Sequence, residues 1–303
     1  MIGILGASGY IGRAFVKELV SQEILFREYN RERDDYYDIK KLVDIIHRDE
    51  INLLINCAGY TGKPNVDTCE YNKNECYEAN ADLVKRLAVV CSMTDTTLLH
   101  ISSGCIYTGD KDGEGFTEED EPNFHSTSEV KGSFYSSTKT LAESIIKSVW
   151  DKHYIARLRI PFDNNDDSRN YLSKLQKYEK LLEASNSISH KGDFVKACIH
   201  LFKNNCEYGV YNIVNSGSIN TSEVAEILKK NKLIDSYHLL DENEFYEQVK
   251  PKAPRSNCIL DNNKLLNTGF KMRGASEAVM DCIKNWNSEN EDLNKSQKNS
   301  KNK

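Results

Sequence analysis

The sequence predicts an α/β fold in which a doubly wound parallel sheet precedes a smaller C-terminal lobe. Short apolar runs alternate with helical patterns from residue 1 to about residue 160, and this alternation is typical of strands joined by crossover helices. A glycine-rich turn directly follows the first apolar run, at residues 6–12. The polar run at residues 163–168 then interrupts the alternation, and the pattern after it is mixed. A chain of 303 residues has room for one large domain or two unequal ones.

Apolar runs and their periodicity place the individual elements. Strands of the first part are expected at residues 2–5, 23–28, 53–56, 97–101 and 155–160. Helices are expected between them at residues 10–21, 38–48, 67–93 and 134–150. Beyond the polar run we expect helices near residues 169–183, 193–204, 221–231 and 275–286, and a strand at 209–214.

These ranges divide the chain into three parts. A sheet domain is expected at residues 1–160, and a smaller lobe, mainly for the substrate, at residues 161–286. Residues 287–303 consist largely of Asn, Ser, Lys and Glu, a composition that cannot offset the entropy cost of ordering. We therefore expect a disordered tail there.

Charge and composition exclude several classes of protein. The chain has 40 Lys and Arg residues and 46 Asp and Glu residues. The resulting formal charge of −6 gives no general attraction to nucleic acid or anionic lipid. No apolar stretch approaches the ~20 residues needed to cross a bilayer, so no membrane segment is expected. The nine cysteines include no C-x-x-C pair and no histidine at zinc-ligand spacing, which predicts free thiols and no metal site. Because no signal segment precedes the first strand, we expect a cytoplasmic protein.

The segment Gly6-Ala7-Ser8-Gly9-Tyr10-Ile11-Gly12 lies between the first strand and the first helix. Glycines in this context let the backbone approach a pyrophosphate at the helix N-terminus, which predicts an NAD(P)-binding domain of the Rossmann type. The spacing G-x-x-G-x-x-G is typical of short-chain dehydrogenases. A tight turn without a ligand is the plain alternative. The residues expected to contact the cofactor are Gly6, Ser8, Gly9, Tyr10, Ile11 and Gly12 in this segment, and Cys57, Ala58, Gly59 and Tyr60 after the third strand.

The choice between NADPH and NADH depends on the end of the second strand. No clear acidic residue is placed there to hold an NAD ribose, whereas Arg31 and Arg33 lie near that point and could meet a 2′-phosphate. NADPH is therefore the expected cofactor, with NADH as the alternative. Both arginines could equally be solvated residues of a charge-rich loop.

Tyr135 and Lys139 lie four residues apart on a predicted helix and so share one face. An adjacent ammonium lowers the pKa of a phenol, ordinarily near 10, towards the range where it can act as an acid or base. About 30 residues earlier, a strand ends in Ile101-Ser102-Ser103, at the sheet edge where doubly wound folds bind ligands. A Ser, Tyr and Lys set in that arrangement would polarise and protonate a carbonyl oxygen during hydride transfer. The alternative is a Tyr and a Lys on a surface helix.

Four segments resemble a known family. They are Asn56–Glu70, Gly104–Ile106, Gly132–Ser136 and Ala253–Asn257, and the similarity extends over the chain apart from its tail. The family is the bifunctional UDP-4-keto-6-deoxyglucose 3,5-epimerase/4-reductase of UDP-L-rhamnose synthesis, a dTDP-4-dehydrorhamnose reductase-like group within the extended short-chain dehydrogenase/reductase superfamily. The resemblance implies conversion of UDP-4-keto-6-deoxy-D-glucose to UDP-L-rhamnose, by epimerisation at C3 and C5 followed by NADPH-dependent reduction of the C4 ketone.

The same resemblance implies the roles of five residues. Ser103, Tyr135 and Lys139 would carry out the reduction, and Cys105 and Lys174 the epimerisation. The C4 ketone acidifies the protons at C3 and C5, which must leave from one face and return to the other. A thiol and an amine suit this task if nearby positive charge tunes the thiol and desolvation tunes the lysine. Without the resemblance, Cys105 is one of nine thiols and Lys174 is a solvated helix residue.

For the substrate, the resemblance implicates Arg255, whose guanidinium suits a pyrophosphate, together with Asn65, Arg169 and Asn170. The chain departs from the family in extra polar residues at 125–131, which we expect to form a surface loop close in sequence to Tyr135.

Several alternatives remain open at this point. A GDP-fucose synthase carries out the analogous double epimerisation and reduction, but it uses a histidine at the position of Lys174. A dTDP-4-keto-rhamnose reductase would leave Cys105 and Lys174 without a role. A non-catalytic NADP-binding regulatory subunit belongs to another class, and the intact Ser103, Tyr135 and Lys139 argue against it. The nucleotide base and the oligomeric state, with a homodimer as one option, are not determined by the sequence.

Overall fold

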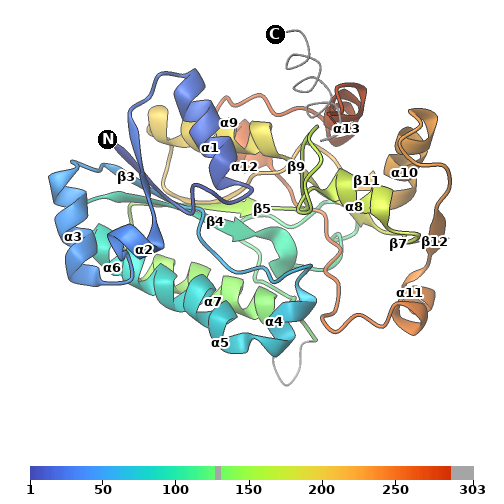
Figure 1. The fold of residues 1–303 in the computed structure, drawn as a ribbon, viewed down its shortest axis with the longest axis horizontal. Coiled ribbons are helices and arrows are strands. Elements are labelled where there is room, and N and C mark those ends of the chain that lie inside the picture. Colours follow the sequence, from blue (N-terminus) through green and yellow to red (C-terminus); the bar gives the residue numbers. More distant parts are fainter. Residues whose placement is uncertain (127–130, 288–303) are drawn as a thin grey trace, which may run out of the picture.

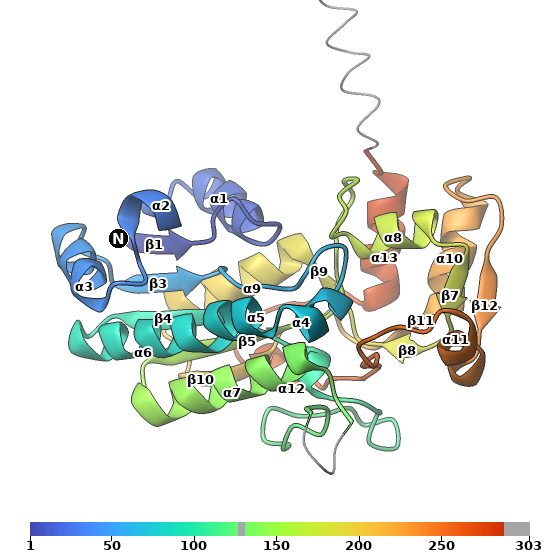
Figure 2. The same ribbon diagram turned by 60° about the horizontal axis from the view of Figure 1, so that its bottom comes forward.

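A six-stranded parallel sheet forms the larger part of the molecule (Figures 1 and 2). The computed structural model describes residues 1–126 and 131–287. The strands follow the order β10-β5-β4-β3-β1-β2 across the sheet. Their bounds are β1 (Ile2–Leu5), β2 (Phe26–Tyr29), β3 (Leu53–Asn56), β4 (Thr97–Ser103), β5 (His153–Leu158) and β10 (Gly209–Asn212). The predicted class, a Rossmann-type doubly wound sheet with a smaller C-terminal lobe, is confirmed.

Helices cover both faces of this sheet (Figure 1). One face carries α1 (Gly12–Ser21), α9 (Lys191–Lys203) and α12 (Asn263–Leu266), and the other carries α3 (Ile39–Arg48), α6 (Leu83–Met93) and α7 (Phe134–Val149). Each face therefore has its own apolar core: Phe15 meets Phe194 edge-to-face at 6.5 Å in one, and Leu42 and Leu87 are fully buried in the other. Strands buried on both faces read as continuous apolar runs, which is why β1 and β3 match their predicted ranges.

The sixth strand of the sheet comes from beyond the predicted boundary at residue 160. We expected residues 193–204 and 209–214 in the smaller lobe, but β10 pairs with β5, with Val210 opposite Ile155, and α9 packs on α1. This part of the prediction is wrong because β5 would otherwise end the sheet with an open edge, and the apolar residues of β10 and α9 are needed to cover it. The order of strands and helices along the sequence does not show that the chain leaves the sheet after β5 and returns to it at β10.

The smaller lobe is built from pairs of short strands and four helices on one side of the sheet domain (Figure 1). The pairs are β6 (Pro161–Phe162) with β9 (Ser189–His190), β7 (Lys180–Leu182) with β12 (His238–Leu240), and β8 (Ser185–Asn186) with β11 (Ile219–Asn220). The helices are α8 (Tyr171–Lys177), α10 (Thr221–Lys230), α11 (Glu242–Gln248) and α13 (Ala275–Lys284). A third core that includes Phe162, Leu172 and Val279 holds α8, α10 and α13 together.

The long helix predicted at residues 67–93 is interrupted. It consists of α4 (Asp67–Tyr71), α5 (Lys73–Tyr77), the π-helical turn η1 (Glu78–Asp82) and α6. Asn72 separates the first two pieces, because its backbone angles of −107° and 59° lie outside the helical region. A π-turn within a helix commonly marks a functional site. The two remaining short helices are α2 (Arg31–Asp34) and the 3₁₀ turn η2 (Gly104–Ile106).

Two predictions fall partly outside the described residues. The disordered tail was predicted for residues 287–303, of which only Asn287 is described, and Asn287 forms a bridge with Asn165. The loop predicted at residues 125–131 likewise lies mostly in the gap at 127–130. Among the described residues, no helix has the length and apolar character to cross a membrane.

Candidate active site

The glycine turn lies at the carboxyl end of β1, next to β3, where the strand order of the sheet reverses. Gly6 has a φ of +71°, and a Cβ placed on it would lie 2.6 Å from the backbone nitrogen of Ala58. A Cβ on Gly12 would lie 2.1 Å from the backbone oxygen of Gly6. Only glycine fits these two positions, and the resulting turn leaves backbone N–H groups at the start of α1. This cradle fits the pyrophosphate of a dinucleotide. The other predicted residues of the turn are Ser8, Gly9 and Ile11.

The segment after β3 forms the opposite wall of the cradle. Cys57 and Ala58 pack against the two cores on either side of the sheet. Asn80, fully buried in the π-turn η1, accepts a hydrogen bond from the backbone N–H of Tyr60 and donates one to its carbonyl, both at 2.8 Å. A Cβ on Gly59 would lie 3.0 Å from Asn80 Oδ1. Asn80 thus fixes the predicted cofactor loop. We did not predict it, and the only signal was an amide inside an apolar helical pattern.

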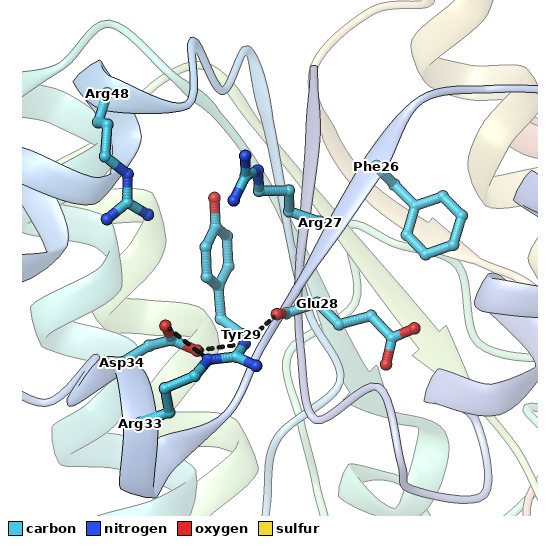
Figure 3. A pocket seen from close by; sticks show the side chains of 7 residues that line it. All are labelled: Phe26, Arg27, Glu28, Tyr29, Arg33, Asp34 and Arg48. Atoms are coloured by element: carbon cyan, nitrogen blue, oxygen red, sulfur yellow. Dashed lines mark hydrogen bonds and ion pairs between the residues drawn. The ribbon is translucent and has the colours of Figure 1, made fainter.

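The two arginines predicted to meet a 2′-phosphate, Arg31 and Arg33, lie on α2, directly after β2. Figure 3 shows Arg33 among the residues around this point. A cavity of about 500 Å³ lies there, and Arg33 is part of its wall, with Nη2 donating to the backbone oxygen of Glu28 at 2.8 Å. Arg33 also pairs with Asp34 at 2.8 Å. Arg31 turns away, with its guanidinium 4.5 Å from the ring centre of Tyr37. The structure therefore puts Arg33, but not the Arg31 side chain, into the wall of this cavity.

Ser103, Tyr135 and Lys139 converge at the carboxyl end of β4. Ser103 is the last residue of that strand, and its hydroxyl accepts from the backbone N–H of Cys105 at 3.1 Å. Tyr135 and Lys139 project from the first turns of α7, where the Lys139 ammonium donates to the backbone oxygen of Ile101 at 3.0 Å. All three side chains are nearly buried, at 6%, 7% and 5% exposure in the order given.

The ionisation of this set differs from the expectation that Lys139 lowers the pKa of Tyr135. Burial, followed by the charge of Cys105, raises the pKa of Tyr135, against the opposing hydrogen bond from Ser103. Burial lowers the pKa of Lys139 from 10.5 to about 8. That expectation is wrong because enclosure disfavours the charged forms of both groups, and the ammonium is directed at a backbone carbonyl rather than at the phenol.

Cys105 and Lys174 come from different lobes but lie near enough to interact electrostatically. Cys105 lies in η2 directly after β4, and Ser136 of α7 donates to its backbone oxygen at 2.7 Å. Lys174 lies on α8. Burial, then the charges of Arg169 and Arg255, lower the pKa of Lys174, while Cys105 is close enough to act in the opposite direction. Desolvation thus tunes the amine in the expected direction.

Two of the predicted substrate residues, Arg169 and Asn170, lie just before α8, the helix that carries Lys174. Their side chains differ in burial and in hydrogen-bond partners. Arg169 donates to the hydroxyl of Thr61, in the loop after β3. Asn170 is fully buried as the N-cap of α8, with Oδ1 accepting from Leu172 N at 3.0 Å and Nδ2 donating to the Asp163 carbonyl at 2.8 Å. Its side chain leaves no exposed polar atom for a substrate, so the structure gives Asn170 a positioning role for α8 instead of the predicted contact.

Arg255 bridges the two lobes. Its guanidinium holds Asp67, at the start of α4, through two hydrogen bonds of 2.7 and 3.1 Å. Asn65 accepts from the backbone N–H of Asp67 at 2.9 Å and so shapes the same turn. The paired carboxylate orients the guanidinium of Arg255, whose charge acts on Lys174.

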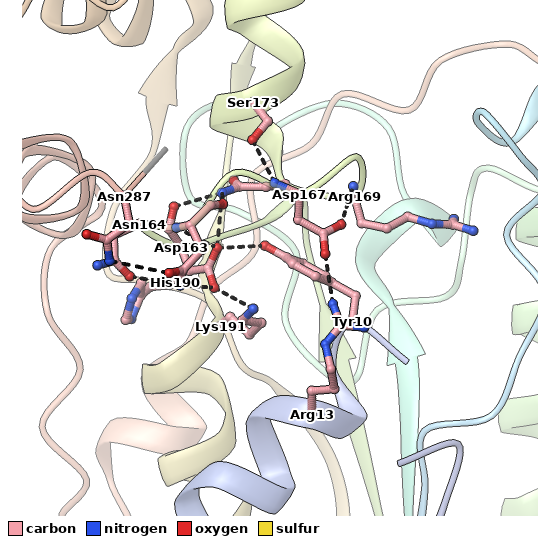
Figure 4. A network of polar contacts seen from close by, with 12 residues as sticks. Tyr10, Arg13, Asp163, Asn164, Asp167, Arg169, Ser173, His190, Lys191 and Asn287 are labelled. Carbon is pink, nitrogen blue, oxygen red and sulfur yellow. Dashed lines mark hydrogen bonds and ion pairs between the residues drawn. The ribbon is translucent and has the colours of Figure 1, made fainter. Parts of the chain in front are cut away.

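Tyr10 was predicted at the cofactor, and its side chain points towards the smaller lobe (Figure 4). Its hydroxyl donates to Asp163 Oδ1 at 3.2 Å, and the ammonium of Lys191 lies 4.0 Å from the centre of its ring. Arg13 of α1 pairs with Asp167 at 2.8 Å. These contacts join the glycine turn and the start of α1 to the loop that leads into α8. The helix that carries Lys174 is therefore held in place partly by residues of the predicted cofactor turn.

A doubly wound sheet with a dinucleotide cradle and a buried Ser, Tyr and Lys set defines an extended short-chain dehydrogenase/reductase. The family model described as the RmlD substrate binding domain matches residues 1–288. The chain belongs to this family.

Two curated relatives are epimerase/reductases from Arabidopsis thaliana. The bifunctional dTDP-4-dehydrorhamnose 3,5-epimerase/dTDP-4-dehydrorhamnose reductase is 30% identical over 287 residues, covering 92% of this chain and 91% of that protein. A trifunctional UDP-glucose 4,6-dehydratase/UDP-4-keto-6-deoxy-D-glucose 3,5-epimerase/UDP-4-keto-L-rhamnose-reductase is 32% identical over 269 residues, covering 86% of this chain and 39% of that protein. The chain therefore spans well under half of the trifunctional relative.

Two solved structures share the fold. A UDP-rhamnose synthase from Acanthamoeba polyphaga mimivirus superposes with a TM-score of 0.84 at 21% identity, covering 93% of this chain and 98% of that chain. A dTDP-4-dehydrorhamnose reductase from Bacillus anthracis, in complex with NADP, superposes with a TM-score of 0.77 at 21% identity, covering 93% and 97%.

Proposed function

We propose that this protein is a bifunctional epimerase/reductase that converts UDP-4-keto-6-deoxy-D-glucose into UDP-L-rhamnose with NADPH. One observation carries the proposal: a thiol, Cys105, and a partly desolvated amine, Lys174, share one site with Ser103, Tyr135 and Lys139. A simple ketone reductase uses only the last three. The additional acid–base pair is what exchange of protons beside the ketone requires.

Epimerisation is the work of Cys105 and Lys174. They approach from different lobes, so a sugar bound between the lobes would present opposite faces to them. A proton removed from C3 or C5 leaves its electron pair delocalised onto the C4 ketone oxygen. The lowered pKa of Lys174 increases its neutral fraction near neutral pH, which allows the amine to exchange protons in both directions.

Reduction must follow epimerisation, because C3 and C5 are acidic only while C4 is a ketone. Ser103 donates a hydrogen bond to the C4 oxygen and Tyr135 gives it a proton. The raised pKa of Tyr135 keeps its phenol protonated at neutral pH, as a proton donor requires. Lys139 would anchor the nicotinamide ribose. When bound, the nicotinamide supplies the hydride.

The nucleotide part of the substrate is expected at a cationic group beside this site. Arg169 and Arg255 both act electrostatically on Lys174, and Asp67 pairs with Arg255. Such a cluster suits a pyrophosphate, whichever base it carries. The name of the bifunctional relative supports dTDP as the second candidate base.

The decisive experiment supplies purified protein with UDP-, dTDP- and GDP-linked 4-keto-6-deoxyglucose in turn, with NADPH or NADH, and identifies the products by NMR. We expect UDP-L-rhamnose with NADPH, and no reduced product from the Tyr135→Phe variant. A reduced product that keeps its original configuration at C3 and C5 would show that the protein is a simple reductase without epimerase activity. No reduction of any of the three sugars would overturn it.

A further inference from the structure

Arg159, directly after β5, is a buried cation that the proposed mechanism has not yet used. Its side chain is enclosed, with 2% of the residue exposed. Nη1 donates to the sulfur of Cys105 at 2.9 Å, and Nη2 donates to Asn186 Oδ1 and to the backbone oxygen of Ser256, each at 2.5 Å. Among the residues that the structure describes, its Nε has no hydrogen-bond partner. An arginine is always protonated in proteins, so this enclosed group carries a full positive charge.

A buried charge requires a countercharge, and the usual one is missing here. Within residues 1–126 and 131–287, no carboxylate oxygen lies within 4.0 Å of the Arg159 guanidinium. Its amide and carbonyl partners are neutral. A group that ionises in direct contact with the guanidinium would supply the missing countercharge.

The ionisable groups among the main influences on Arg159 are Cys258, Cys105 and Tyr171, and two of them are unsuitable. Burial raises the pKa of Cys258, whose thiol donates to the backbone oxygen of Gly104 at 3.3 Å. Burial also raises the pKa of Tyr171 to about 12. Cys105 is the third, and it accepts a hydrogen bond from the guanidinium itself.

Most of the titratable groups on which Cys105 acts are basic. Cys105 acts electrostatically on Lys139 and Tyr135 from α7, Lys174 from α8, Arg159 from the end of β5, and Cys258. Three of these five are basic and none is a carboxylic acid.

We propose that Arg159 holds the Cys105 sulfur as a thiolate and aims it at the substrate, so that Arg159 is the positioning residue on which the sulfur's action as a base depends. This inference rests on the proposed epimerase function. In the step itself, the thiolate takes the proton from the carbon beside the ketone, the S–H bond forms as the C–H bond breaks, and the C–H electron pair moves onto the ketone oxygen.

Residues from both lobes hold the Arg159 side chain in its position beside Cys105. Asn186 belongs to β8 of the smaller lobe, and Ser256 belongs to the segment that carries Arg255. A Cβ on Gly104 would lie 3.2 Å from Arg159 Cδ and 2.7 Å from Leu260, so the glycine before Cys105 leaves room for the arginine stem. Contacts from both lobes therefore orient the arginine that donates to the sulfur.

The test measures the thiolate without relying on turnover. Wild type, Arg159→Met and Arg159→Lys are treated with iodoacetamide near neutral pH, and alkylation of each cysteine is followed by peptide mass spectrometry. We expect the rate at Cys105 to fall by roughly tenfold or more in Arg159→Met, with Arg159→Lys retaining part of the wild-type rate. Cys206, which is partly exposed and lies elsewhere in the sheet domain, serves as the internal control and keeps its rate. An unchanged rate at Cys105 in a folded Arg159→Met protein overturns the inference.

A stability cycle decides the matter if Arg159→Met fails to fold alone. Cys105→Ala leaves Arg159 without its countercharge and should lower the melting temperature, and adding Arg159→Met should restore part of that loss. Additive losses in the double variant overturn the pairing. The two hypotheses are also separable: absence of solvent-deuterium uptake in wild type would remove the epimerase function, whereas the alkylation result stands or falls with Arg159 alone.

Discussion

Replacing Lys139 by methionine should change how the stability of the fold depends on pH. Lys139 is 5% exposed, and burial lowers its pKa from 10.5 to about 8. At roughly 1.4 kcal/mol for each pH unit, this difference corresponds to about 3 kcal/mol of unfavourable free energy when the buried group is charged.

The direction of the effect follows from proton binding. Below pH 8 the folded chain keeps the ammonium buried, and the cost is fully present. Between pH 8 and 10.5 the folded state has lost this proton while the unfolded chain still holds it, so the stability of the wild type rises with pH. The free energy of unfolding of wild type relative to Lys139→Met should thus increase by about 3 kcal/mol across this window. Near neutral pH the variant should be the more stable protein by about 2 kcal/mol, since it also loses the hydrogen bond to Ile101, worth about 1 kcal/mol.

Urea unfolding of wild type and Lys139→Met at several pH values measures this difference directly. The matched control is Lys147→Met, because Lys147 is exposed on the same helix and its replacement should leave the pH dependence unchanged. A constant gap between wild type and Lys139→Met over the whole pH range would refute the reasoning.

Glu143→Leu should lower the free energy of unfolding by about 3–5 kcal/mol, because it leaves Arg157 charged and unpaired; their side chains are 3% and 1% exposed and 2.8 Å apart. In urea unfolding, Glu143→Leu/Arg157→Met should recover most of that loss, and a further loss in the double variant would contradict the account. Arg255→Ala should raise the KM for the nucleotide sugar by roughly tenfold or more with little change in kcat, because a phosphate contact is equally strong in ground and transition states, and Arg255→Lys should retain part of the affinity. An unchanged KM would rule out the phosphate contact. Arg33→Ala should raise the KM for NADPH by about tenfold and leave that for NADH unchanged, and an equal rise for both would mean that Arg33 only supports the wall of the cavity at the end of β2.

The central strands were the part of the fold best predicted from the sequence. β1 and β3 are buried along their whole length on both faces, so their apolar runs begin and end with the strands themselves. The break at Asn72 and the π-turn around Asn80 were not predicted, because the apolar pattern of residues 67–93 continues through both. The position of β10 depends on pairing with a strand more than fifty residues earlier, which no local pattern encodes.

The site divides in the same way. The glycine turn and the Tyr135 and Lys139 pair have local spacing that predicts them, and Cys105 and Lys174 were reached through the family resemblance. Arg159 was missed because its partners, Cys105 and Ser256, lie 54 and 97 residues away in the sequence. A buried charge is visible only when its surroundings are known, and a lone arginine after a strand gives no sign of it.

Solvent-deuterium incorporation in the absence of NADPH tests the central claim most directly. The proteins are incubated with UDP-4-keto-6-deoxyglucose in heavy water, and deuterium at C3 and C5 of the sugar is followed by NMR. Wild type and Tyr135→Phe should both introduce deuterium at C3 and C5. Cys105→Ala and Lys174→Ala should label both positions much more slowly than wild type. If Tyr135→Phe and Cys105→Ala lost labelling together, or if wild type introduced no deuterium at all, the assignment of proton exchange to the thiol and the amine would be contradicted.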